Sequence, residues 1–140
     1  MTEIIKKDTD YAMRMLAFLA LNNGKAPVAA RKLAKAGEVP VDFAYKILQK
    51  LTRAGLAVGI MGSHGGFKLG KAPKDIALLE VVSATQGDIS VRKCCLARDA
   101  CNRQGICDIS KVLGGIQNNL TGSLKKITLA DVLKEAQNKK

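Results

Sequence analysis

Four cysteines lie close together in the second half of the chain, and three of them are evenly spaced. Cys95, Cys101 and Cys107 are each six residues from the next, and Cys94 adjoins the first of them. Cysteine thiolates are the usual ligands of iron–sulfur clusters, whereas structural zinc sites use closely paired cysteines of the C-x(2–4)-C type, which this segment lacks. The spacing therefore favours an iron–sulfur cluster and leaves zinc, a disulfide switch and inert cysteines as alternatives.

The chain between residues 25 and 74 is strongly basic. It holds ten Lys and Arg residues against two acidic residues, Glu38 and Asp42, and so carries +8 of the formal net charge of +11. This balance favours an anionic partner, although charge alone does not separate DNA from RNA, a membrane surface or an acidic protein. An enzyme is disfavoured, because the sequence has no C-x-x-C pair, no histidine beside its cysteines and no phosphate-binding glycine loop at the start of a helix.

Three helices are expected in the first part of the chain, as its apolar periodicity indicates. They are predicted over residues 8–22, 28–36 and 41–54. Gly37 ends the second helix, so that the second and third helices meet across a short turn, which is the helix-turn-helix pattern. The buried stripe of the third helix is expected to comprise Phe43, Ile47, Leu48 and Leu51.

A β-hairpin is expected directly after these helices. Its strands are predicted over residues 56–61 and 67–69, and glycine-rich residues 62–66 form the turn, where glycine supplies positive φ angles. Such a hairpin is the wing of a winged helix-turn-helix, in which backbone amides come close to phosphate oxygens. The expected fold class is therefore mostly α with a small β-hairpin wing, together with a long dimerisation helix.

That long helix is predicted over residues 109–127, after a helix at 78–86 and the cysteine segment. Its apolar residues form one stripe, which comprises Ile109, Val112, Leu113, Ile116, Leu120, Leu124 and Ile127. A stripe of this kind needs a partner, and we expect a dimer in preference to packing on its own domain. A capping box at residues 128–131 opens a last helix. The predicted organisation is a winged helix-turn-helix domain (1–87), a cysteine-rich sensor loop (88–108), a dimerisation helix (109–127) and a short C-terminal helix with a frayed tail from 137 (128–140).

No segment of the sequence resembles an export signal or reaches the roughly 20 apolar residues that a membrane span needs. We therefore expect a cytoplasmic protein with no membrane partner. In that compartment, cysteines are more often free, metal-bound or redox-active than paired in structural disulfides.

Nine residues are candidates for contact with DNA. Those on the third helix, which can reach base edges or phosphates in the major groove, are Asp42, Tyr45, Lys46, Gln49 and Lys50, with Tyr45 and Lys46 the strongest. Arg31 on the second helix is expected to contact a phosphate, and the wing contributes Ser63, His64 and Lys68. The alternative is that these are solvated surfaces, and for His64 we weigh DNA contact equally against solvent exposure, both ahead of metal ligation.

Several motifs resemble those of one family, the winged-helix transcription regulators typified by the iron–sulfur cluster regulator IscR, the nitric-oxide-sensing repressor NsrR and the cysteine-metabolism repressor CymR. The resemblance covers nearly the whole chain and is carried by residues 9–14, 39–43, 47–51, 54–56, 65–69, the six-residue cysteine ladder and 127–131. It implies a homodimer with a long crossed dimerisation helix, and a palindromic operator in double-stranded DNA. For members with three cysteines it implies an iron–sulfur cluster, here held by Cys95, Cys101 and Cys107.

Two positions depart from the family. Met61 stands where many relatives carry a wing arginine, so that the wing's contacts with DNA would be weaker or fall to His64 and Lys68. Ser110 replaces the histidine that serves one member as the fourth cluster ligand. The resemblance therefore leaves the fourth iron site open.

Asp10 is the expected fourth ligand, because it matches the aspartate that the nitric-oxide-sensing relative contributes from its first helix. Cys94 is the alternative, although neighbouring cysteines rarely bind one cluster, and Ser110 and solvent stay open. Three thiolates with one weaker ligand suit a sensor, since such a cluster is easier to attack or lose. The resemblance favours a 4Fe–4S cluster over a 2Fe–2S cluster.

The sequence thus predicts a DNA-binding transcription regulator, expected to be a repressor. Its operator affinity would depend on the cluster or the redox state of the Cys95, Cys101 and Cys107 loop. The alternative is a regulator of the same fold without a cluster, which responds through its thiols or to a small molecule and acts by docking on a partner enzyme.

Overall fold

The computed structural model describes residues 3–92 and 108–138, so that Cys94, Cys95, Cys101 and Cys107 lie outside the described residues. The α-helices of the described residues are α1 (Lys7–Leu21), α2 (Ala30–Gly37), α3 (Val41–Arg53), α4 (Leu78–Thr85), α5 (Asp108–Lys126) and α6 (Leu129–Asn138). The strands β1 (Ala57–Ile60) and β2 (Gly66–Leu69) form an antiparallel pair, and a short 3-10 helix, η1, spans Pro73–Asp75.

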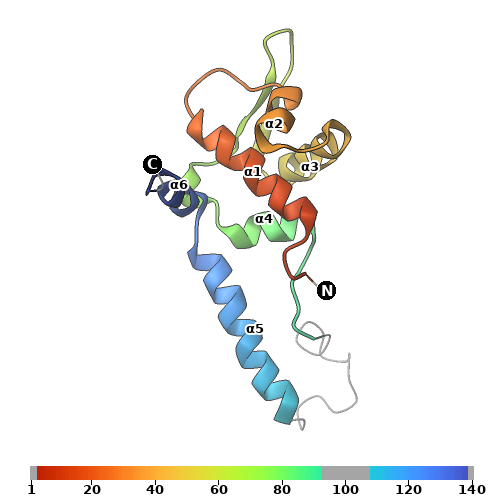
Figure 1. Cartoon of the computed structure of the whole chain (residues 1–140), viewed down its shortest axis with the longest axis vertical. Coiled ribbons are helices and arrows are strands. Elements are labelled where there is room, and N and C mark those ends of the chain that lie inside the picture. Colours follow the sequence, from red (N-terminus) through yellow and green to blue (C-terminus); the bar gives the residue numbers. More distant parts are fainter. Residues whose placement is uncertain (1–2, 93–107, 139–140) are drawn as a thin grey trace.

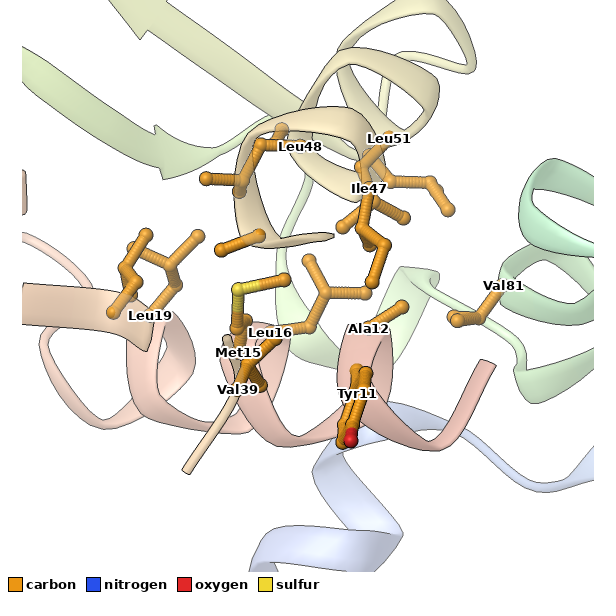
Figure 2. Close-up of a cluster of buried hydrophobic side chains, with 14 of the residues drawn as sticks. Tyr11, Ala12, Met15, Leu16, Leu19, Val39, Ile47, Leu48, Leu51 and Val81 are labelled. Carbon is orange, nitrogen blue, oxygen red and sulfur yellow. The ribbon is translucent and has the colours of Figure 1, made fainter. Parts of the chain in front are cut away.

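Helix α1 runs through the middle of a helical body that it forms with α2, α3, α4 and α6 (Figure 1). Its buried side chains are Thr9, Tyr11, Ala12, Met15, Leu16, Leu19 and Ala20. All of these except Thr9 belong to the same hydrophobic core as Ile47, Leu48 and Leu51 of α3 and Val81 of α4 (Figure 2). Burying an aliphatic side chain of this size contributes about 1.5–3 kcal/mol, so this core fixes α3 against α1.

The predicted helix-turn-helix is confirmed. Helices α2 and α3 are joined by a short turn in which Glu38 adopts a left-handed conformation with φ of 54°, and the Val39 amide donates to the Ala34 carbonyl at 2.8 Å. Gly37 makes the turn compact, because a Cβ there would lie 3.2 Å from Cγ2 of Val39 and 3.3 Å from Cβ of Arg14.

The buried face of α3 differs from the predicted stripe at one residue. The helix buries Ala44, Ile47, Leu48 and Leu51, while Phe43 is 49% exposed. The buried positions follow the spacing i, i+3, i+4 and i+7 from Ala44, so that Phe43 falls beside the buried face. The prediction was wrong at Phe43, because a large apolar residue was preferred to the small one that follows it.

The predicted wing is confirmed as a hairpin in which Ala57 pairs with Leu69 and Ile60 with Gly66. Val28, expected to start the second helix, instead pairs with Phe67: each amide donates to the other residue's carbonyl, at 3.0 and 2.8 Å. Only glycine fits at residue 66, because a Cβ there would lie 2.5 Å from the carbonyl of Val28. These contacts attach the base of the wing to the segment before α2.

Helix α6 returns to the helical body. The amide of Leu129 donates to the Ile76 carbonyl at 2.9 Å, and the Leu129 side chain is fully buried in the core of α1 and α3. The predicted capping box is confirmed, since the Thr128 amide donates to Oδ2 of Asp131 at 2.9 Å. This bond and one from the Thr128 hydroxyl hold the pKa of Asp131 below its usual value. The helix runs to Asn138, past the point where a frayed tail was predicted.

Helix α5 extends away from the body (Figure 1) and continues without a break through Gly114 and Gly115. None of its residues is buried, and Ile109, Val112 and Ile116 are 67%, 66% and 50% exposed. Its apolar stripe is therefore largely uncovered by the described part of the chain. Over residues 3–92 and 108–138, no helix is both long and apolar enough to cross a membrane.

Candidate nucleic-acid interface and sensor site

The outward face of α3 carries four of the candidate DNA-contacting residues. Asp42, Tyr45, Lys46 and Gln49 are all exposed, because the core takes up the opposite side of the helix. The ammonium group of Lys46 lies 6.0 Å from the centre of the Phe43 ring. The exposed face of α3 thus combines hydrogen-bonding groups with an aromatic side chain, the two kinds of group that read base edges in a major groove.

The start of α2 adds positive charge beside the wing. Arg31 and Lys32 are exposed in the first turn of α2, which contains no acidic residue. Lys25, Lys32 and His64 line an open cleft between this helix start and the tip of the wing, and no acidic side chain in the described part of the chain lines it. Backbone amides at a helix start also favour an anion. This cleft suits a negatively charged group.

The wing presents its candidates to solvent. Ser63 and His64 are exposed at the turn and Lys68 is exposed on β2. Met61, the residue that departs from the family pattern, is 96% exposed at the wing's tip. The structure therefore brings His64 close to α2, while Ser63 and Lys68 stay on the hairpin itself.

Most of the basic residues between 25 and 74 have no acidic partner among the described residues. In the described ranges, the ion pairs are Lys50 with Asp8, Lys71 with Glu80, and Arg14 with Asp10. Partial burial raises the pKa of Glu80, but hydrogen bonds from Lys71 and the Ala77 amide outweigh it and leave that pKa below its usual value. Because so few of these cations are neutralised by residues 3–92 and 108–138, α2, α3 and the wing form a positively charged surface.

Lys50 is engaged differently from the other candidates on α3. Its ammonium group donates to the carbonyl of Thr85 at 3.1 Å and lies 3.7 Å from Oδ2 of Asp8. This side chain is therefore held by the protein's own backbone at the end of α4.

Asp10, the candidate cluster ligand, lies exposed in the first turn of α1. The Arg14 guanidinium donates to Oδ2 of Asp10 at 2.8 Å and, through its other terminal nitrogen, to the carbonyl of Gly37 at 3.1 Å. Arg14 thus joins Asp10 to the turn that precedes α3. Cys94, Cys95, Cys101 and Cys107 lie outside the described residues, and nowhere within residues 3–92 and 108–138 do three His, Cys, Asp or Glu side chains gather to hold a metal ion.

Two glutamine side chains hold the segment that leads into the cysteines, and sequence reasoning missed both. Gln86 accepts from the Lys6 amide and the Thr9 hydroxyl at 2.9 and 2.6 Å, and donates to the Ile4 carbonyl at 2.9 Å. On α5, Gln117 donates to the Ile89 carbonyl and accepts from the Val91 amide, both at 2.7 Å. No local motif marks either residue, because the partners in these bonds are distant in sequence.

Comparisons with known proteins agree on one family. The sequence profile of the Rrf2 family, described as an iron-dependent transcriptional regulator, matches residues 5–135. The chain is 33% identical over 131 residues to the protein aau3 of Rhizobium meliloti, which covers 93% of this chain and 84% of that protein. It is 30% identical over 126 residues to the HTH-type transcriptional regulator NsrR of Bacillus licheniformis, which covers 89% of this chain and 88% of that protein. The solved structure of CymR, the global cysteine regulator of Bacillus subtilis, shares the fold with a TM-score of 0.78, at 21% identity over 96% of this chain and 98% of its own.

Proposed function

The chain belongs to the Rrf2 family of transcriptional regulators, and we propose that it binds a palindromic operator as a homodimer whose DNA affinity follows the state of its cysteine segment. The observation that carries the proposal is the positively charged surface of α2, α3 and the wing, where few basic residues have an acidic partner within the described chain. We propose no enzymatic activity, and a cytoplasmic location follows from the proposed role.

DNA contact is assigned to groups that the fold leaves exposed. Tyr45 and Gln49 of α3, with Asp42 at its start, would face base edges in the major groove, and Lys46 on the same face would reach a phosphate. Arg31 would contact a phosphate, and Ser63, His64 and Lys68 would contact the DNA from the wing. Exposure of each side chain supports this assignment, while the backbone contact of Lys50 argues for leaving that residue out.

A second copy of the chain would cover α5. Ile109, Val112 and Ile116 are at least half exposed on one helix of 19 residues, and apolar stripes of this length gain stability when a second helix packs against them. A twofold dimer presents two α3 helices, and a two-fold operator repeats its half-site at about 34–36 Å or a multiple of it. This relation between a dimer and its DNA supports the palindromic operator.

Cys95, Cys101 and Cys107 would hold an iron–sulfur cluster, with Asp10 as fourth ligand and Cys94 as the alternative. The Asp10 side chain fits such a role, because it is exposed and, in the part of the chain described, only its Oδ2 atom accepts a hydrogen bond. When bound, an iron–sulfur cluster supplies a redox-active centre whose stability depends on its ligands and solvent exposure. The family resemblance favours the 4Fe–4S form.

Arg14 would transmit a change in the contacts of Asp10 to α3. With Asp10 free, its carboxylate orients the Arg14 guanidinium, which in turn holds the Gly37 carbonyl before α3. If Asp10 turns to the cysteine segment, Arg14 loses a charged partner, and its hold on the turn changes. The proposed sensing step is thus a rearrangement of two hydrogen bonds at the base of the helix-turn-helix.

DNA binding is tested through its dependence on salt. Each phosphate contact contributes roughly 0.9 log unit of affinity per log unit of salt, so Lys46→Met and Arg31→Met should each lower that slope if both residues reach phosphates. Lys134→Met on α6 is the matched control and should leave it unchanged. A slope that stays constant in both interface variants would overturn the assignment of these contacts.

The cluster is tested by anaerobic purification with iron and sulfide assays. We expect a coloured protein with iron and sulfide in near-equal amounts, and loss of both in Cys101→Ala. A colourless protein that cannot be reconstituted, yet binds DNA, would favour the regulator that works without a cluster.

Coupling is tested with Arg14→Met, which removes both hydrogen bonds. The ratio of operator affinities between cluster-loaded and cluster-free protein should fall towards one. Lys7→Met is the control, because Lys7 and Arg14 both lie over the Tyr11 ring, at 5.8 and 5.6 Å, and only Arg14 reaches Gly37. A ratio that survives in Arg14→Met would remove this route.

A further inference from the structure

A polar cluster lies within the helical body where α1, α3 and α4 meet. Thr9 and Thr85 are the buried polar residues among those described, at 0% and 6% exposure. Their hydroxyl oxygens lie 2.6 Å apart, and the Thr85 hydroxyl also donates to the Val81 carbonyl at 2.8 Å. Buried hydroxyls persist where every polar atom finds a partner, so this cluster joins α1 to α4 in one arrangement.

Lys50 brings α3 into the same cluster. Thr85 is the last residue of α4, and the final carbonyls of a helix have no partner within the helix. The Lys50 ammonium donates to one of them at 3.1 Å and lies 3.7 Å from the Asp8 carboxylate of α1. A cation at the C-terminal end of a helix is also favoured by the helix dipole.

Gln86 extends the cluster to the root of the cysteine segment. Its side-chain oxygen accepts from the Thr9 hydroxyl at 2.6 Å and from the Lys6 amide at 2.9 Å, and its side-chain nitrogen donates to the Ile4 carbonyl at 2.9 Å. One residue later the chain turns at Gly87, with φ of 84°, towards the residues that lead to the cysteines. Helix α3 and the segment that leads to the cysteines are therefore held by the same cluster of polar contacts, which we call the anchor.

We infer that Lys50 is a positioning residue, which sets α3 against the end of α4 and acts on DNA only through that placement. Gln86 completes the anchor from the other side, through its bonds to Thr9, Lys6 and Ile4. This inference deepens the proposed function, and it rests on that function only where DNA affinity is the readout.

The test replaces Lys50 by Met, which keeps the length of the side chain and removes its charge and donor. Operator affinity should fall about tenfold, the scale of one hydrogen bond from a charged donor, while the salt slope stays at the wild-type value. Lys46→Met on the same helix is the matched control and should lower the slope by roughly 0.9. If the salt slope of Lys50→Met also falls by roughly 0.9, Lys50 itself reaches a phosphate and the inference is overturned. An unchanged affinity would overturn it as well.

Rescue and coupling separate positioning from a general loss of stability. Lys50→Arg should recover most of the affinity, because its guanidinium can donate to the same carbonyl. Lys50→Met and Gln86→Leu should weaken binding by less together than the product of their separate effects, since both disrupt one anchor. Lys46→Met with Gln86→Leu should simply multiply. Failure of the rescue, or simple multiplication for Lys50 with Gln86, contradicts the inference.

Hydrogen exchange without DNA keeps this test independent of the proposed function. Exchange of the α3 amides should speed up in Lys50→Met and Gln86→Leu, and should match wild type in Lys46→Met. If the wild-type protein binds no DNA but the three variants differ from it in exchange as described, the proposed function fails and the anchor stands. If exchange in α3 is unchanged in both anchor variants, the anchor itself is wrong.

Discussion

Helices α1 and α5 share an apolar repeat but have opposite surroundings. Each repeats apolar residues at helical spacing, but α1 buries seven of its 15 residues, whereas α5 buries none of its 19 within the described chain. Helices α2, α3, α4 and α6 pack around α1, whereas α5 extends beyond them (Figure 1). An apolar stripe thus indicates that a helix face is buried, but not what buries it. The stripe of α1 is covered by other helices of the same chain, and for α5 we propose that a second copy covers it.

The largest expected effect contrasts one residue from each helix. Leu16→Ala should lower the free energy of unfolding by about 2–5 kcal/mol, because it leaves a cavity in a closed core. Val112→Ala, measured in dilute monomer, should cost less than about 0.5 kcal/mol, since Val112 is 66% exposed. Urea denaturation of both variants checks this. Equal losses would mean that α5 is already covered within one chain.

A charge on the α5 stripe should separate the proposed dimer. Ile116→Asp is expected to yield monomers in sedimentation. It should weaken binding to a palindromic DNA by roughly 100-fold, because the two α3 helices are no longer held together in one dimer. Asn118→Asp places the same charge on an exposed polar residue of the same helix and should leave a dimer. A dimeric Ile116→Asp would place the contact elsewhere.

A smaller effect is expected at the polar contact between α5 and the segment before the cysteines. Gln117→Leu removes the acceptor of the Val91 amide, which lies 2.7 Å from Oε1. Exchange of that amide should speed up by roughly fivefold, the scale of one ordinary hydrogen bond. Thr121→Val is the control on the same helix, since it loses the contacts of the Thr121 hydroxyl with the Gln117 side-chain amide and backbone carbonyl, at 3.2 and 2.8 Å, but keeps the acceptor of the Val91 amide. Unchanged exchange at Val91 would show that α5 does not hold this segment.

The smallest effect concerns the cap that joins α5 to α6. Hydrogen bonds from Thr128 hold the pKa of Asp131 below its usual value, so ionised Asp131 stabilises the fold above the ordinary aspartate range and ceases to do so as the pH falls through the lowered pKa. Wild type should therefore melt slightly above Asp131→Ala at neutral pH, and the two should converge in acid. A difference in melting temperature that does not change with pH would contradict this account of the cap.

The elements were predictable where local spacing decides them. The periodicity of α3 already separates Ile47, Leu48 and Leu51 from Tyr45 and Lys46, and glycines mark the wing. Phe43 was misplaced because periodicity gives the direction of a buried face less accurately than its existence. The wider family, and with it the fold, was available from motifs along the whole chain.

The contacts that tie these elements together were not predictable. Lys50 looks like any other cation on α3, and its partner Thr85 lies 35 residues away. Gln86 and Gln117 bind the carbonyls of Ile4 and Ile89, which only folding brings near them, so no local pattern marks these contacts. The assignment of individual DNA contacts and cluster ligands stays a prediction for the same reason, since it depends on partners outside the chain or on residues beyond those described.

One measurement tests the central claim most directly. Wild-type protein is purified without oxygen, assayed for iron and sulfide, and compared before and after removal of the metal for binding to a palindromic DNA selected from a random library. The account predicts at least a tenfold change in affinity, about 1.4 kcal/mol, which is lost in Cys101→Ala. Equal affinity in both states, with metal present at the start, would contradict the sensing role.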